Sequence, residues 1–372
     1  MKLRALLLAS LVAIACLPSS ARADALAAQK TLLSGVNQIM SVLAPAPDSA
    51  PRTFSTTLRI VRATGLPQDV VGREAALAFQ APDKLRLSAK VGDETYSAGR
   101  NGGRLWMHVA GKKFGVIGSP DAPRFKTDEG RPDGTKLPPF KLPVTREQLL
   151  LLPLLCSVET LPDEAVLDEP CAVLRLTPKS EARAAMNLPA ATVTLWLRKS
   201  DDAPLRIGYA DGRKVEVIVE LDGLALEPAW PDSAWNLQAG PEDNIETVAL
   251  GHLTRFLPAA LDMLGQKLPP LGPATGERRV LARHGKGRLE MRDGTRVLFL
   301  EGMPEEIGAQ HGTLMKKEVH HLVRRILYGV GVGSSFGKGR WFFGEIEEAQ
   351  SRLQPFVSGR HLREMDALAA AA

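Results

Sequence analysis

Acidic and histidine side chains gather in one stretch of the sequence, LEGMPEEIGAQHGTLMKKEV, residues 300–319. Glu305, Glu306 and His311 are groups that can exchange protons or bind a metal ion. The spacing argues against a metal site, because Glu306 and His311 are five residues apart and the HExxH pattern is absent. Pro304 suits the first turn of a helix, where no backbone donor is needed, and acids in that turn favour the helix dipole. The stretch therefore predicts a helix start, with no metal and no cofactor.

Two glycines of this predicted helix, Gly308 and Gly312, are four residues apart and so share one helix face. Each glycine costs about 1 kcal/mol relative to alanine in a helix. The pair therefore predicts that another backbone segment packs closely against that face.

Cys156 and Cys171 are the only cysteines after residue 23. In an oxidising compartment an even pair is a disulfide candidate, and closing a loop of this size would stabilise the fold by about 3 kcal/mol. Two buried thiols are the alternative, and both remain open because the strand geometry decides between them. No CxxC motif or nearby histidine indicates a metal site at either cysteine.

The first 23 residues are typical of a secretory signal peptide. Lys2 and Arg4 precede an apolar run that is too short to span a bilayer comfortably, and Ala21-Arg22-Ala23 offers small residues for cleavage before Asp24. We therefore expect export to the periplasm. Cys16 raises the alternative of a lipid-anchored form, but the Ala-Arg-Ala site is the better cleavage signal.

Removal of this segment takes away three basic residues and no acid, which lowers the formal net charge from +5 to +2. A nearly balanced chain gives no indication of nucleic-acid binding.

Hydrophobic periodicity divides the rest of the chain. Residues 26–43 show helical spacing, whereas residues 53–118 consist of short alternating runs separated by Gly, Pro and Asp, which predict antiparallel strands. Alternating runs resume over residues 171–221, giving about ten strands in total, and a sheet of that size is expected to curl. The predicted fold class is α+β, a large curled antiparallel sheet with helices.

The second half of the sequence predicts a helix over residues 243–267, a linker to residue 286 and a β-hairpin turning at Asp293-Gly294. Three helical stretches follow, at 304–328, 341–355 and 359–372, with GVGVGSSFGKGR expected to form a flexible loop between helices.

The layout of residues 24–245 resembles the LolA-like fold of exported lipoprotein carriers. A signal peptide precedes an N-terminal helix and a long antiparallel sheet, and DGRKVEVIVELDGL running into PDSAWNL is similar to the closing strands of such domains. The resemblance implies a half-barrel that holds an acyl chain, lipid or apolar peptide on its concave face, with helices as a lid. The candidate residues of that face are Leu85, Leu87, Leu105, Met107, Val193, Leu195, Leu197, Val217 and Val219.

A filled core is the alternative interpretation of the same apolar face. Helices at 26–43 and 147–155 would then cover it, and periodicity alone does not distinguish a filled barrel from an empty one.

A second resemblance covers residues 287–372. The strand end LFLEG followed by MPEEIGAQHGTL resembles the opening of penicillin-acyltransferase-like N-terminal-nucleophile (Ntn) hydrolases, except that Glu305 stands where an aromatic residue is common. The matching residues are Glu301, Gly302, Pro304, Glu306, Gly308, His311 and Gly312.

This second resemblance implies the N-terminal fragment of an αββα domain that frees a cysteine nucleophile by cutting its own chain and acts on amide bonds. No cysteine follows Cys171, so no catalytic residue is carried over, and we expect a truncated chain or one part of a split protein. Residues 246–286 would connect this fragment to the half-barrel.

Two functions are therefore expected. The first is an exported protein that forms the front part of an autoprocessing Ntn acyltransferase or amidohydrolase and carries a half-barrel for lipid or peptide. The alternative is a non-enzymatic periplasmic carrier or binding protein for lipid or lipoprotein. The sequence gives no indication of the oligomeric state.

Overall fold

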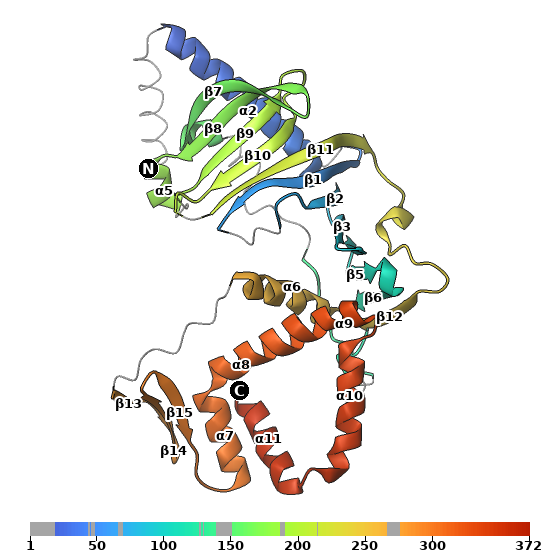
Figure 1. Cartoon of the computed structure of the whole chain (residues 1–372), viewed down its shortest axis with the longest axis vertical. Coiled ribbons are helices and arrows are strands. Elements are labelled where there is room, and N and C mark those ends of the chain that lie inside the picture. Colours follow the sequence, from blue (N-terminus) through green and yellow to red (C-terminus); the bar gives the residue numbers. More distant parts are fainter. Residues whose placement is uncertain are drawn as a thin grey trace. The chain divides into compact units, whose positions relative to one another are not determined.

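The chain forms two compact units, Met1–Gly111 with Leu137–Gln238 and Lys112–Lys136 with Ala239–Ala372. The computed structural model is drawn in Figure 1. It describes residues 19–43, 45, 49–65, 70–125, 128, 130–138, 151–186, 190–213, 215–265 and 276–372. Residues 1–18 of the predicted signal peptide lie outside the described part of the chain. No helix in the described part of the chain is long and apolar enough to cross a membrane.

A 12-stranded sheet dominates the structure, in the order β12-β6-β5-β4-β3-β2-β1-β11-β10-β9-β8-β7. It is curled but not closed, since β12 and β7 form its two edges. The α+β half-barrel predicted from the sequence is confirmed. The strands are β1 Arg52–Thr64, β2 Glu74–Gln80, β3 Lys84–Val91, β4 Glu94–Asn101, β5 Arg104–Val109, β6 Phe114–Ser119, β7 Cys156–Val166, β8 Glu169–Pro178, β9 Thr192–Arg198, β10 Pro204–Ala210, β11 Glu216–Pro228 and β12 Asn244–Ala249.

The first unit has one long helix, α2 (Ser19–Leu43), together with the short helices α4 (Leu152–Leu155) and α5 (Ser180–Met186). Apolar residues of α2 recur every fourth position, at Ala28, Leu32, Val36 and Met40, and all four are buried. They pack with Leu174, Leu176 and Leu197 of β8 and β9. The helical periodicity of residues 26–43 therefore reflects a helix that covers one end of the sheet.

Strand β7 was missed by the sequence analysis, in which strands resumed only at residue 171. Pro162 and several acids interrupt its alternation, and a bulge lies between Leu161 and Glu164. These features are tolerated because β7 is an edge strand, where a missing backbone donor disrupts no second ladder.

The second unit contains β6, β12, a three-stranded sheet and the remaining helices. Its further elements are α6 Leu250–Gly265, β13 Arg278–His284, β14 Gly287–Arg292, β15 Thr295–Phe299, α7 Pro304–Leu314, α8 Lys316–Val323, the π-helix η5 Arg324–Gly331, α9 Val332–Lys338, α10 Phe342–Leu353 and α11 Gly359–Ala371.

Three expectations for this unit were wrong. The predicted helix 243–267 begins as strand β12, which pairs in parallel with β6, and only α6 continues as helix. The expected linker to residue 286 contains a strand, β13, which pairs with the first strand of the hairpin; the predicted hairpin itself, β14 and β15 with its turn at Asp293-Gly294, is confirmed. The segment GVGVGSSFGKGR is largely helical rather than a flexible loop, because burial of Val332 and Phe336 outweighs the low helix propensity of its glycines.

Helices α7 and α11 approach closely at Gly308 and Gly312. A Cβ atom on Gly308 would collide with the carbonyl oxygen of Glu364 and lie 2.9 Å from the Cβ of Ala367. One on Gly312 would collide with the carbonyl oxygen of Leu368. The close backbone approach predicted from these two glycines is confirmed.

His252 of α6 lies fully buried in an aromatic cluster of this unit. Its ring stacks on Phe343 with 4.1 Å between ring centroids, and Trp341 and Tyr328 lie about it. Nε2 donates a hydrogen bond to the carbonyl of Arg124 at 2.7 Å, and Nδ1 is buried without a partner. The ring is therefore held in its neutral form.

We expect His252 to make the second unit less stable in acid. Burial lowers the pKa of His252 below its ordinary value, and the positive charges of Arg124 and Arg255 lower it further. The Arg124 carbonyl and the Asp133 carboxylate act in the opposite direction. Below about pH 6.5 the unfolded chain binds a proton at this residue that the folded chain excludes. The free energy of unfolding therefore decreases as the pH is lowered, by up to about 1.4 kcal/mol for each pH unit.

The measurement is the free energy of unfolding between about pH 7 and pH 5 for the unchanged chain and for His252→Phe. The phenylalanine variant should have the shallower pH dependence. Equal slopes would show that this histidine does not titrate differently on folding.

Candidate ligand cavity beneath the N-terminal helix

The nine apolar residues proposed from the sequence as a binding face share one side of the sheet. Directly opposed residues of paired strands point to the same side. The register joins Leu87 through Ala98 to Met107, and Leu195 through Ile207 to Val219. The same reasoning places Leu85, Leu105, Val193, Leu197 and Val217 on this side, which we call the inner face.

The inner face is not covered evenly. At the β7–β9 end, Leu197 is 1% exposed and packs under α2, with Val193 and Leu195 partly buried beside it. Towards β3 the cover is thinner, and Leu87 is 38% exposed. The filled-core interpretation fits the β7–β9 end among the described residues, whereas residues 147–150 of the second predicted covering helix lie outside them.

A cavity of about 250 Å³ lies on the inner face next to the C-terminal part of α2. Phe54 and Leu58 of β1, Leu77 of β2 and Ile207 of β10 contribute to its wall. Val42, Pro204, Leu221, Leu224 and Leu226 complete the apolar lining, and Gln38 is its one polar residue. Among the described residues the lining contains no ionisable group, so the cavity is suited to hold an apolar group.

None of the nine residues named from the sequence lines this cavity. They share only the side of the sheet on which the cavity lies. Phe54, Leu58 and Leu77 alternate in the same way, but periodicity does not indicate where α2 ends and leaves space.

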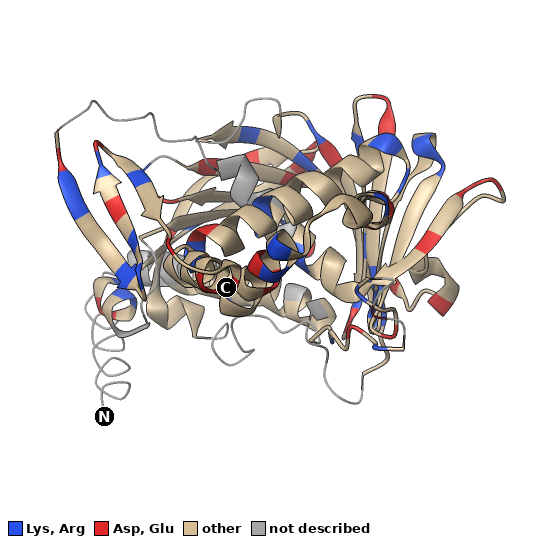
Figure 2. Cartoon of the chain, turned by 90° about the horizontal axis from the view of Figure 1, so that it is seen from below, with Lys and Arg blue, Asp and Glu red and all other residues tan. Residues whose placement is uncertain are grey.

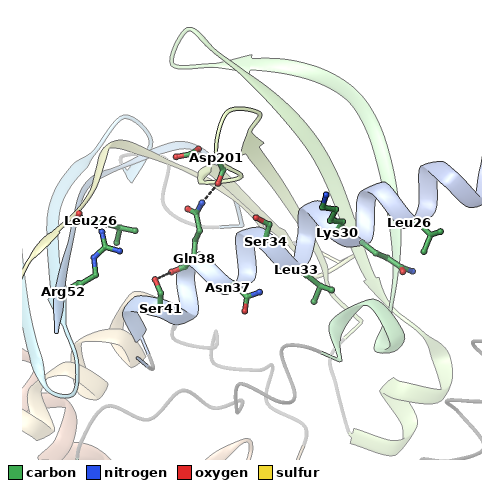
Figure 3. Close-up of a pocket in the computed structure, with 11 residues that line it drawn as sticks. Leu26, Lys30, Leu33, Ser34, Asn37, Gln38, Ser41, Arg52, Asp201 and Leu226 are labelled. Carbon is green, nitrogen blue, oxygen red and sulfur yellow. Dashed lines mark hydrogen bonds between the residues drawn. The ribbon is translucent and has the colours of Figure 1, made fainter. Parts of the chain in front are cut away.

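A wider groove of about 880 Å³ runs along α2 beside the cavity, and Gln38 and Leu226 line both. Figure 3 shows Gln38 reaching towards Asp201, and its side-chain amide donates a hydrogen bond to the Asp201 carbonyl. Arg52, also in the groove, donates from Nη2 to the carbonyl of Leu226 at 3.0 Å. Lys30 adds a second cation. The cavity is thus apolar, whereas the adjoining groove mixes leucines with polar residues, the basic Lys30 and Arg52 and the acidic Asp201.

The charged cluster of this unit lies on the opposite, outer face of the sheet. Glu220, which is 4% exposed, accepts hydrogen bonds from Arg59 and Arg206, each 2.6 Å from a carboxylate oxygen. Burial alone would raise the pKa of Glu220, but the bonds from Arg206 and Arg59 outweigh it and hold the pKa below its ordinary value. This ion cluster joins strands β1, β10 and β11 and does not face the cavity.

The two cysteines are free and buried, and they do not meet. Cys156 at the start of β7 opposes Pro178, whereas Cys171 opposes Glu164 at the other end of the β7–β8 pair. Such separation along a strand far exceeds the Cα distance that a disulfide allows. Burial raises the pKa of both thiols, which keeps them protonated. The disulfide candidate is therefore wrong for this structure.

Residues of the Ntn-like motif have structural positions. Pro304 is the first residue of α7, and the Glu306 side chain accepts a hydrogen bond from the Met303 amide at 2.8 Å. Gly302 has a φ of 130°, and a Cβ there would collide with the Glu306 carboxylate.

Two further residues complete the start of this helix. Gln310, missed by the sequence analysis, exchanges two hydrogen bonds with the backbone of Glu301. His311 lies beside Arg296 and Glu318 in a shallow groove. No group of three or more potential metal-binding side chains occurs among the described residues.

Comparison with known proteins finds no matching family model and no matching curated protein. Similar solved structures include LprF from Mycobacterium bovis, with 12% identity and a TM-score of 0.33 over 57% of this chain and 97% of that one. Mycobacterium tuberculosis lipoprotein LppX matches with 11% identity and a TM-score of 0.31, over 53% and 94%.

The Pseudomonas aeruginosa MucA/MucB complex structure matches with 15% identity and a TM-score of 0.31, over 73% of this chain and 78% of that one. TM-scores of this size do not establish a shared fold, and the matches lend no support to the Ntn resemblance. The half-barrel description therefore rests on the sheet of this chain.

Proposed function

We propose that this protein binds a single apolar chain, such as the acyl chain of a lipid or lipoprotein, between α2 and the inner face, and acts as a carrier. The observation that carries the proposal is the cavity lined by Phe54, Leu58, Leu77 and Ile207, whose described lining residues include no ionisable one. Burying apolar surface there would contribute about 25 cal/mol for each Å² removed from water.

The surroundings of the cavity support an amphipathic ligand. Lys30 and Arg52 lie in the adjoining groove, which shares Gln38 and Leu226 with the cavity and also contains Asp201. An apolar tail in the cavity would place a polar or anionic head within reach of these cations, where it could remain hydrated. An apolar peptide is a less suitable ligand, because its backbone donors and acceptors would be buried against a wall with one polar residue.

An enzymatic role has less support. The cysteine chemistry of the first expected function needs a nucleophilic thiolate after the motif of residues 301–312, and no cysteine follows Cys171. Burial raises the pKa of both Cys156 and Cys171, which makes neither of them a substitute. The first unit therefore supports the carrier, and the amide-bond chemistry is not proposed for this chain.

Filling the cavity should abolish ligand binding. Leu77→Trp adds a ring to the cavity wall, whereas Val91→Trp adds the same ring on β3 where Val91 is 52% exposed and outside the lining. We expect saturable binding of the fluorescent fatty acid cis-parinaric acid to the unchanged chain. Leu77→Trp should weaken it at least tenfold, or about 1.4 kcal/mol, and Val91→Trp should not.

Circular dichroism of both variants would verify that they are folded. The proposal fails if the unchanged chain shows no saturable binding, or if both tryptophan variants bind as well as it does.

A further inference from the structure

The three-stranded sheet of the second unit has two different faces. Leu289 is 6% exposed, and a Cβ on Gly287 would meet the Gln310 side chain of α7. Gly287, Leu289 and the residues opposite them therefore face α7. The other face carries Arg278, Arg288, Glu290, Arg292 and Phe299, as the register shows, together with Arg283 opposite Arg288.

Glu290 organises three of these arginines. It is 2% exposed and accepts hydrogen bonds from the Nε atoms of Arg278, Arg288 and Arg292 at 3.2, 2.7 and 2.8 Å. These bonds lower the pKa of Glu290 to about 2, with the bond from Arg288 the largest cause. The carboxylate is therefore ionised at neutral pH and holds the guanidinium groups in fixed positions.

Phe299 supports two of the same arginines from within the sheet. The guanidinium carbons of Arg288 and Arg292 lie 4.1 and 4.7 Å from the centroid of its ring. An arginine has five N–H donors, and Glu290 uses only part of this capacity. Donors therefore remain for an external anion, on side chains that are 33% exposed for Arg288 and 36% for Arg292.

The charge of this sheet exceeds what Glu290 can neutralise. The arginine face carries Arg278, Arg283, Arg288 and Arg292 against the single acid Glu290, a net charge of +3. The other basic residues of 276–299 pair elsewhere, Arg279 with Glu277, Lys286 with Glu301 and Arg296 with Glu318. Figure 2 shows the basic residues along these strands in blue. Exposed aliphatic side chains accompany them, with Val280 44% and Leu281 37% exposed on the edge strand β13.

We propose that the arginine face of the β13–β15 sheet binds the surface of an anionic phospholipid membrane. Fixed guanidinium groups suit phosphate recognition, and basic residues near a membrane surface attract anionic lipids. Val280, which opposes Glu290 on this face, could enter the interfacial layer, which a purely electrostatic partner such as nucleic acid would not require. This inference does not depend on the acyl-chain cavity, because it rests on the second unit alone.

Vesicle binding by the full chain tests the proposal. We expect binding to vesicles of phosphatidylglycerol mixed with phosphatidylcholine, none to phosphatidylcholine alone, and weaker binding as salt is raised. Arg283→Gln/Arg292→Gln removes two charges and leaves Glu290 paired with Arg278 and Arg288. The affinity of this variant for the anionic vesicles should be lower by roughly tenfold or more, because each basic residue near the membrane surface contributes to the binding free energy.

The matched control is Arg352→Gln/Arg360→Gln, which removes the same charge from exposed positions in α10 and α11. It should bind nearly as well as the unchanged chain. Equal weakening by both variants would show a nonspecific charge effect and overturn the site. Tighter binding to a duplex oligonucleotide than to the vesicles would overturn the choice of partner.

Discussion

Replacing Gly308 by alanine should destabilise the contact between α7 and α11 by about 2 to 3 kcal/mol. The new methyl group would occupy the position of the Glu364 carbonyl and lie 2.9 Å from the Cβ of Ala367. The main chain of α11 would have to move, because the colliding atom belongs to the backbone. The substitution should gain about 1 kcal/mol in helix propensity, so a net loss measures the packing conflict.

Gly344→Ala is the matched control for this change. Gly344 lies in α10, and no atom would be within 4 Å of its Cβ. That substitution should leave stability unchanged or raise it by up to about 1 kcal/mol. Hydrogen exchange of the α7 and α11 amides gives the readout, because it reports local opening in a chain with two units. If Gly308→Ala protects these amides as well as Gly344→Ala does, the close approach is wrong.

Gly99→Ala should destabilise the first unit by about 2 to 4 kcal/mol. Gly99 on β4 lies beneath the indole ring of Trp106 on β5, and a Cβ would collide with the ring and lie 2.7 Å from its Nε1. That Nε1 donates a hydrogen bond to the carbonyl of Trp235 at 2.7 Å, and Trp235 is fully buried. Displacing the ring would break this bond and expose the tryptophan below it.

A glycine in the neighbouring turn provides the comparison. Gly103 connects β4 to β5, and a Cβ there would meet no atom within 4 Å. Urea unfolding followed by tryptophan fluorescence should give a much lower midpoint for Gly99→Ala than for Gly103→Ala. Similar midpoints for the two variants would mean that the Trp106 ring does not rest on Gly99.

The sequence was sufficient to predict the type of sheet, the first helix and the side of that helix that is buried. The alternation of KLRLSAKV predicts a strand, and this stretch is β3. The spacing of four residues between Leu32, Val36 and Met40 predicts one buried helix side, and these residues are the buried side of α2. These patterns are local, and each records which side of an element is buried. The glycine pair of α7 was equally informative, because two costly residues on one face imply a close neighbour.

Features that depend on distant segments could not be obtained in this way. Residues 244–249 form strand β12 because they pair in parallel with β6, and nothing in their own sequence indicates this pairing. The cavity exists because α2 covers part of the inner face, and this limit is set by tertiary packing. The carboxylate of Glu290 meets Arg278 only because β13 pairs with β14. An alternating pattern identifies which face of a strand is apolar, but it does not identify the strand or helix that packs against that face.

Photo-crosslinking with a fatty acid that carries a diazirine near the end of its chain is the most direct test of the central claim, a chain-binding cavity beneath α2. Mass spectrometry of the cross-linked peptides identifies where the tail lies. We expect cross-links to β1, β2, β10 and β11, at Phe54, Leu58, Leu77, Ile207 or Leu221, and their loss in Leu77→Trp. Cross-links confined to the second unit, or an unchanged pattern in Leu77→Trp, would contradict it.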